Sequence, residues 1–110
     1  MVVVIFRSRI KEACSDEYYA KAAEMGRIAE SMPGFISYKA YSAQDGERVS
    51  IHEWDTAEHL RAWRDHPRHS EVQAYGREHF YRDYTSYVCD NPRESRFVDP
   101  TEKESTEDVK

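Results

Sequence analysis

The sequence predicts an α+β fold of the ferredoxin-like kind, with the element order β-α-β-β-α-α-β and a four-stranded antiparallel sheet. Two observations predict it. Stretches with strand alternation and stretches with helical periodicity follow one another in this order between residues 1 and 90. The predicted strands also carry large or apolar residues on both faces, so the sheet face without helices needs a cover. A second copy of the sheet would supply it, and we expect a homodimer that forms a dimeric α/β barrel.

The first strand and the first helix are predicted before residue 33. Residues 2–10 are rich in β-branched side chains, which is typical of a central strand. Ser15 supplies a capping hydroxyl for a helix, and Pro33-Gly34 ends it. The apolar stripe of this helix comprises Tyr18, Ala22, Met25, Ile28, Ala29 and Met32. Small residues at Ala22, Ala23 and Gly26 would let the helix lie close to the sheet.

The next two strands are predicted to form a hairpin. Residues 35–42 and 47–54 both alternate, and the Asp-Gly pair between them is a common hairpin turn. Strict alternation places Phe35 and Tyr38 on opposite faces of the first of these strands.

Two shorter helices and a last strand complete the predicted domain. Asp55 is the expected N-cap of the first helix, with Glu58 three residues later as in a capping box. The expected buried stripe of this helix is Ala57, Leu60 and Trp63. Pro67 breaks the helix, a further helix is expected over residues 68–80, and the last strand over 82–90.

The composition sets the domain organisation. With 110 residues, 39% of them hydrophobic, the chain can bury one modest core, which we place in residues 1–90. Residues 91–110 form a polar C-terminal tail, which we expect to be disordered or laid over the partner subunit.

Charge and hydropathy restrict the partners. The net charge of −5 and the lack of a basic stripe argue against nucleic acid. No apolar run is long enough for a membrane span or a signal peptide, so we expect no membrane partner and a cytoplasmic location. Cys14 and Cys89 are then expected to be free thiols.

Five short motifs follow one another along the chain. They are Pro33-Gly34-Phe35, Asp45-Gly46, His52-Glu53-Trp54-Asp55, Leu60-Arg61-Ala62-Trp63 and His66-Pro67-Arg68-His69. In order and spacing they resemble the antibiotic biosynthesis monooxygenase family over residues 2–90. The resemblance implies a dimeric α+β barrel with a pocket between the sheet and the helices. Some characterised relatives oxidise polycyclic aromatics with molecular oxygen and without metal or flavin, others bind and degrade haem, and many have no assigned substrate.

The resemblance extends to individual residues. Trp63 matches the helix tryptophan that lines the pocket in both branches, and His69 matches a frequent histidine after the helix break. The haem-degrading branch also uses an asparagine where this chain has Arg7 or Ser8, and a histidine near the position of Gln73. These two differences disfavour haem degradation.

We therefore expect a cofactor-independent monooxygenase that oxidises a small or polycyclic aromatic, such as a phenol or quinol, with molecular oxygen. This chemistry needs a base to deprotonate the substrate, donors to stabilise the anion, and flat walls to orient it. The candidate bases are His52, His69 and His79, which the sequence does not separate. The candidate donors are Arg7, Tyr38 and Tyr84, and the candidates for substrate contact are Trp54, Trp63, Tyr75 and Phe80.

Alternative interpretations stay open at this stage. The same barrel could be a non-catalytic binding protein for a hydrophobic metabolite, or a haem-binding protein. Trp63 could be a core residue, His69 could cap its helix, and His59 is expected to face solvent. His66 and His69 have spacing that suggests a metal site, but no acid or cysteine completes a ligand set, so we expect no metal and no cofactor.

Overall fold

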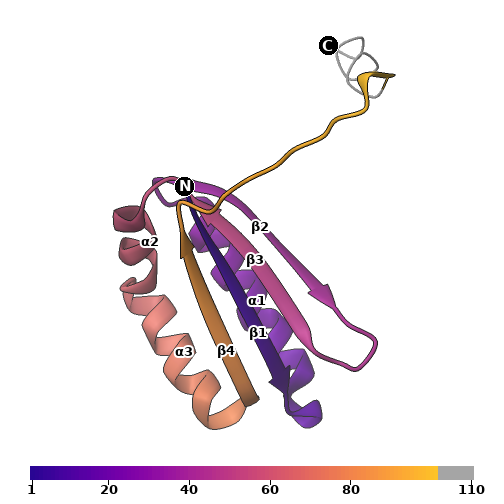
Figure 1. The fold of residues 1–110 in the computed structure, drawn as a ribbon. Helices are drawn as coiled ribbons and strands as arrows, with labels where there is room; N and C mark the ends of the chain where they lie inside the picture. Colours follow the sequence, from indigo (N-terminus) through magenta and orange to yellow (C-terminus); the bar gives the residue numbers. More distant parts are fainter. Residues whose placement is uncertain (102–110) are drawn as a thin grey trace.

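The computed structural model describes residues 1–101, and its elements follow the predicted order (Figure 1). The strands are β1 (Val2–Ile10), β2 (Phe35–Ser42), β3 (Arg48–Trp54) and β4 (Tyr81–Asp90). The helices are α1 (Ser15–Glu30), α2 (Ala57–Arg64) and α3 (Pro67–His79), and the 3-10 turn η1 (Glu12–Cys14) precedes α1. The predicted α+β fold is confirmed.

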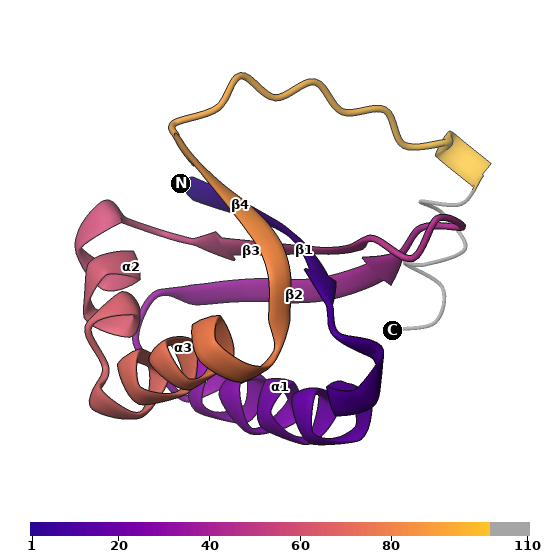
Figure 2. The ribbon, with the colours of Figure 1, turned by 90° about the horizontal axis from the view of Figure 1, so that it is seen from below.

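The four strands form one antiparallel sheet in the order β2-β3-β1-β4. The apolar strand β1 lies inside the sheet, where Val4 pairs with His52 of β3 on one side and with Val88 of β4 on the other. All three helices cover the same face (Figure 2). Because side chains alternate along a strand, this register places His52 on the face that the helices cover.

The core lies between this face and the helices. Its buried cluster is Val2, Val4, Ala29, Trp54, Leu60 and Trp63. The predicted stripe of α1 packs against it through Ala29, with Met25, Ile28 and Met32 partly buried beside it. The stripe predicted for α2 is confirmed at Leu60 and Trp63 but wrong at Ala57, which is exposed in the first turn.

The two predicted helix caps are wrong. Ser15 makes no capping hydrogen bond, because η1 already leads the chain into α1 and the N-cap position falls on Cys14. Thr56 rather than Asp55 caps α2, since its hydroxyl oxygen accepts from the backbone N–H of His59 at 3.2 Å. The carboxylate of Asp55 instead contacts the His59 ring, 2.7 Å from Nδ1.

A β-bulge changes the predicted facing of β2. The pairing of β2 with β3 shifts between Phe35 and Ser37, so strict alternation fails at this point. Phe35 consequently turns towards the core and packs edge-on against Trp54, with 5.6 Å between the ring centres. Tyr38, which pairs with His52, lies on the same covered face.

The opposite face of the sheet carries no helix (Figure 2). Its central part is apolar and comprises Val3, Ile5, Tyr41, Val49, Ile51 and Tyr87, three of which (Tyr41, Ile51 and Tyr87) are exposed by 36% to 51%. This is the face for which we predicted a second subunit as cover, and the pairing of two such sheets stays a prediction.

Residues 91–101 extend away from the domain after β4 (Figure 1). Phe97 in this segment is 85% exposed, so it makes no anchor on its own domain. The remainder of the predicted tail, 102–110, lies outside the described residues. Between residues 1 and 101, none of the helices has the length and apolar character to cross a membrane.

Candidate active site

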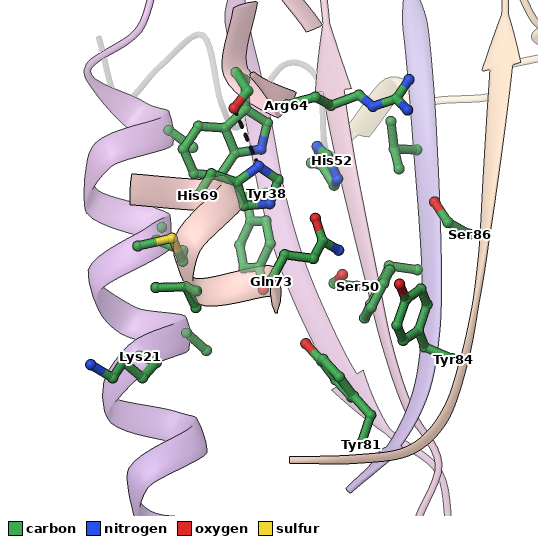
Figure 3. Close-up of a pocket in the computed structure, with 18 of the residues that line it drawn as sticks. Lys21, Tyr38, Ser50, His52, Arg64, His69, Gln73, Tyr81, Tyr84 and Ser86 are labelled. Carbon is green, nitrogen blue, oxygen red and sulfur yellow. Dashed lines mark hydrogen bonds between the residues drawn. The ribbon is translucent and has the colours of Figure 1, made fainter. Parts of the chain in front are cut away.

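A cavity of about 490 Å³ lies between the covered face of the sheet and helices α1 and α3 (Figure 3). Its volume falls in the range of small-molecule sites, roughly 300–1,000 Å³. The sheet contributes Val4, Phe6, Ser50 and His52, and the helices contribute Met25, Trp63, His69 and Gln73, among others. The walls are thus largely apolar, with a few polar groups set among them.

Small side chains on α1 make room for this cavity. Ala22, Gly26 and Ala29 line it, and a Cβ atom added at Gly26 would meet nothing within 4 Å. The sequence suggested that these small residues bring α1 close to the sheet. In the structure at least Ala22 and Gly26 instead border open space.

His69 lies flat against Trp63. The ring centres are 4.2 Å apart with an angle of 11° between the planes. The ring of Trp54 is also nearly parallel to Trp63, with 6.3 Å between the ring centres and an angle of 18°. Trp63 is only 6% exposed. The indole therefore supports the histidine ring rather than offering a bare face to a ligand.

The start of α3 fixes where His69 points. Pro67 occupies the first turn, and the Nδ1 atom of His66 accepts the backbone N–H of Arg68 at 3.1 Å. The capping function considered for His69 thus belongs to His66. The Nδ1 atom of His69 lies 3.2 Å from the carbonyl oxygen of Trp63, drawn as the dashed line in Figure 3. Burial lowers the pKa of His69, so its ring is neutral at pH 7.

His52 reaches the same end of the cavity from β3 (Figure 3). The indole N–H of Trp54 donates to its Nδ1 atom over 2.8 Å. Burial, and to a lesser degree the nearby His69, lower the pKa of His52 to about 4. The cavity therefore holds two histidines that are both uncharged at neutral pH.

Three tyrosines also line the cavity. Tyr81 and Tyr84 lie at its other end (Figure 3), and the ring centre of Tyr38 lies 6.1 Å from that of His52. The guanidinium of Arg48 donates to the Tyr38 hydroxyl at 3.2 Å and lies 5.2 Å from the ring centre of Tyr18. Burial raises the pKa of Tyr81, so its hydroxyl stays protonated and can donate to a ligand.

The charged groups of the lining are all cationic. They are Lys21, Arg64 and Arg77, and within residues 1–101 no aspartate or glutamate lines the cavity. In the same part of the chain neither Arg64 nor Arg77 forms an ion pair. Figure 3 shows Arg64 extending from the end of α2 over the top of the cavity towards β1 and β4. In a protein of net charge −5, this local excess of cations favours an electron-rich or anionic ligand.

The structure separates the predicted site residues into two groups. Those that line the cavity are His52, His69, Tyr38, Tyr84, Trp63 and Phe80. Those that do not are His79, Arg7, Tyr75 and Trp54.

Each residue of the second group is held elsewhere. Arg7 projects from the opposite face of the sheet and pairs with Glu47 at 3.1 Å. Tyr75 donates its hydroxyl to Glu17 of α1 at 3.1 Å, and the exposed His79 follows it on the same side of α3. Trp54 is fully buried behind the cavity wall, so it contacts His52 and not a ligand.

Several cavity residues were missed by the sequence analysis. Gln73 and Arg77 follow His69 at spacings of four and eight residues, which puts all three on one face of α3. This four-residue spacing could have identified the cavity-facing side of α3 from the sequence. It was overlooked because apolar residues on the neighbouring side of the helix indicated that side as the buried face. Ser50 lies two residues before His52 on β3 and so shares its face.

The described part of the chain contains no candidate metal site. Among the residues that the structure describes, no three histidine, cysteine, aspartate or glutamate side chains lie close enough together to hold a metal ion. Cys14 and Cys89 are free thiols, as predicted.

Comparison with known sequences gives a family match. The sequence model of the antibiotic biosynthesis monooxygenase family matches residues 1–75. A Bacillus subtilis (strain 168) protein, the uncharacterized protein YqjZ, is 30% identical over 99 residues, which cover 89% of this chain and 85% of that protein.

Solved structures share the fold. Rv0793 from Mycobacterium tuberculosis superposes with a TM-score of 0.76 at 23% identity, covering 86% of this chain and 98% of that one. SnoaB, a cofactor-independent oxygenase from Streptomyces nogalater, gives a TM-score of 0.72 at 16% identity, covering 84% and 94% of the two chains. At these identities the likeness establishes a common fold.

Proposed function

Because the chain belongs to the antibiotic biosynthesis monooxygenase family, we propose that it is a cofactor-independent monooxygenase that oxidises a flat phenol or quinol with molecular oxygen. The observation that carries the proposal is the cavity in which two neutral histidines, His52 and His69, stand among aromatic walls. The name of SnoaB as a cofactor-independent oxygenase supports the same reaction class on this fold.

The cavity suits a flat, electron-rich guest. Tyr84 of β4 supplies an aromatic wall, and Met25 of α1 supplies an adaptable apolar side chain. Arg64 at the top would attract the anionic form of a phenol. These groups orient the ring system while leaving its reacting atom to the histidines.

The proposed reaction needs few protein groups. A histidine removes a proton from the substrate, and the resulting carbanion or phenolate gives one electron to oxygen. The two radicals combine to form a hydroperoxide at carbon, and loss of water leaves a carbonyl. For an anthrone this converts a CH₂ group and O₂ into a C=O group and one H₂O. The protein supplies the base, the orientation and the stabilisation of negative charge.

Oxygen consumption tests the proposal. An oxygen electrode would follow the purified protein with a panel of anthrones, naphthols and naphthalenediols, and product mass after reaction in ¹⁸O₂ would report incorporation of one labelled atom. We expect His69→Phe to lower the rate by roughly 10²- to 10⁴-fold, since it removes the proton acceptor. His79→Phe is the matched control, because His79 lies outside the cavity and should leave the rate unchanged.

Two results would contradict the proposal. One is oxygen uptake no faster than in buffer across the whole panel, and the other is an equal loss of activity in His79→Phe and His69→Phe. Tight binding of panel members without oxygen uptake would instead identify a non-catalytic binding protein for hydrophobic metabolites. A haem-binding function is disfavoured, because Gln73 lines the cavity in the region where the resemblance implies a histidine.

A further inference from the structure

The hydrogen bond to His52 determines which of its ring nitrogens carries the proton. An indole N–H can only donate, so the Nδ1 atom that receives it from Trp54 at 2.8 Å must be the unprotonated nitrogen. A neutral imidazole with a bare Nδ1 carries its single proton on Nε2. Since Trp54 is fully buried, no solvent competes for this bond. His52 therefore has only an N–H left to offer a ligand.

The hydrogen bond to His69 has the opposite consequence. A backbone carbonyl can only accept, so the Nδ1 atom that lies 3.2 Å from the Trp63 oxygen must carry the proton. The Nε2 atom of a neutral His69 is then the bare nitrogen. Stacking at 4.2 Å on the Trp63 indole holds the ring flat and limits its rotation away from this carbonyl.

We propose that Trp54 and the backbone of Trp63 set opposite tautomers in the two cavity histidines, so that His52 is a fixed N–H donor and His69 a fixed acceptor and the only base of the pair. Trp54 is in this view a positioning residue that acts through His52. The burial that lowers the pKa of both histidines supports the proposal, because a charged ring would donate from both nitrogens.

The assignment defines the ligand that the cavity would recognise. It takes a flat ring system with a hydroxyl or acidic C–H group towards Nε2 of His69 and a carbonyl oxygen towards Nε2–H of His52. This step rests on the proposed function for the aromatic nature of the ligand. When His69 accepts the substrate proton, the negative charge moves to the carbonyl oxygen, where the N–H of His52 stabilises it. The carbonyl of Trp63 remains a partner for the imidazolium of His69.

The tautomers can be measured directly in the free protein. Long-range ¹H–¹⁵N correlation spectra at pH 7.5 distinguish protonated from bare ring nitrogens, and His52→Phe and His69→Phe identify the two sets of signals. We expect a bare Nδ1 in His52 and a bare Nε2 in His69. His66 provides an internal reference, because its Nδ1 accepts the N–H of Arg68 and must be bare. The same tautomer in both cavity histidines, or a charged ring in either, would overturn the proposal.

Four tricyclic probes test the two polar contacts separately. They are fluorene, fluorenone, 9H-fluoren-2-ol and 2-hydroxyfluorenone, which differ only in the carbonyl and the hydroxyl. In the wild type each group should tighten binding by roughly three- to tenfold, the gain typical of one hydrogen bond. His52→Phe should abolish the gain from the carbonyl alone, and His69→Phe the gain from the hydroxyl alone. His52→Gln, whose amide can still donate, should recover part of the carbonyl gain.

A crossed pattern of this kind is not produced by general damage to the fold, which would weaken all four probes equally. Equal losses in both variants, or no gain from either group in the wild type, would overturn the proposal. Neither experiment involves oxygen. The tautomer assignment can therefore fail while oxygen consumption persists, and oxygen consumption can fail while the assignment holds.

Discussion

His52 links the chemistry of the cavity to the stability of the fold. Its ring is enclosed by the sheet and by Trp54, and burial lowers its pKa from 6.5 to about 4. In the unfolded chain the ring meets water and titrates near its ordinary value, about 6.5. The folded protein therefore excludes a proton that the unfolded chain would bind.

We expect the free energy of unfolding to fall as the pH decreases from 6.5 to 4. In this range the unfolded state binds more protons at His52 than the folded state, and full stability is present only above pH 6.5. The loss attributable to His52 is at most about 3 kcal/mol, from the conversion of pKa differences into free energy. Urea denaturation of the wild type and of His52→Phe between pH 7 and 4.5 measures it.

The variant should show a shallower decline with acid than the wild type. Some decline should persist, because burial also lowers the pKa of His69 in the same direction. Parallel curves for the two proteins would show that His52 does not titrate as its surroundings indicate.

At this scale the sequence predicted which residues share a face but not which atoms meet. Residues 47–54 were predicted to alternate, and in the structure His52 and Trp54 share one face of β3. The hydrogen bond between them depends on the side-chain rotamers, which the alternation of residues along a strand does not reveal. The same holds for Trp63, where helical spacing indicated burial but not its stacking against His69.

At the scale of elements, Gly34 joins the start of β2 to the end of β3. Its φ of +84° lies in the left-handed region, and its carbonyl oxygen accepts the N–H of Asp55 at 2.9 Å. A Cβ atom here would collide with the side chains of Asp55 and His59. Gly46 has a similar φ of +91°, but a Cβ atom would meet nothing within 4 Å.

The two glycines form a matched pair for mutation. Gly46→Ala should cost about 1–2 kcal/mol of stability through its backbone conformation alone. Gly34→Ala should cost about 1–3 kcal/mol more, because the side chains of Asp55 and His59 must also move. Thermal or urea denaturation of the two variants compares them. Equal losses of stability in the two variants would show that the side chains of Asp55 and His59 move aside at no cost in free energy.

Helix α3 shows why the face of an element can be assigned wrongly. Tyr75 faces α1, while His69, Gln73 and Arg77 face the cavity, so large or apolar side chains are not confined to one side. From the apolar residues of this helix we predicted Tyr75 and His79 at the site, and neither lines the cavity. A cavity wall contains polar residues, and hydrophobic periodicity does not report them.

At the scale of the molecule, the helix-free face of the sheet predicts a partner. An apolar sheet face with Tyr41, Ile51 and Tyr87 exposed by 36% to 51% is unfavourable in water. A second copy of the same face would bury it on both subunits. We therefore expect a homodimer in solution.

Ile51→Asp tests the dimer, since Ile51 lies on β3 inside this face. Light scattering after gel filtration should give a dimer mass for the wild type and a monomer mass for the variant. Ala57→Asp is the control, because Ala57 is exposed on α2, which covers the other face of the sheet. A monomeric wild type at micromolar concentration would contradict the prediction.

The overall fold could be predicted from the residue pattern, whereas the cavity was predicted only through the resemblance to a family. Strand and helix periodicities, the Pro33-Gly34 stop and the Pro67 break give the order of elements, and each depends on a few neighbouring residues. The space beside Gly26 depends on the distance of α1 and α3 from the sheet. Many tertiary contacts together determine this distance. A small residue is compatible with either close packing or a hollow.

We infer that the cavity between the sheet and α3 binds a flat hydroxy-ketone through His52 and His69. Titration of the wild type with 2-hydroxyfluorenone, followed at the ring nitrogens of all five histidines, tests it most directly. We expect the Nε2 signals of His52 and His69 to shift together and saturate, while those of His59 and His79, outside the cavity, stay in place. Shifts confined to His59 or His79, or no shift at any histidine, would contradict it.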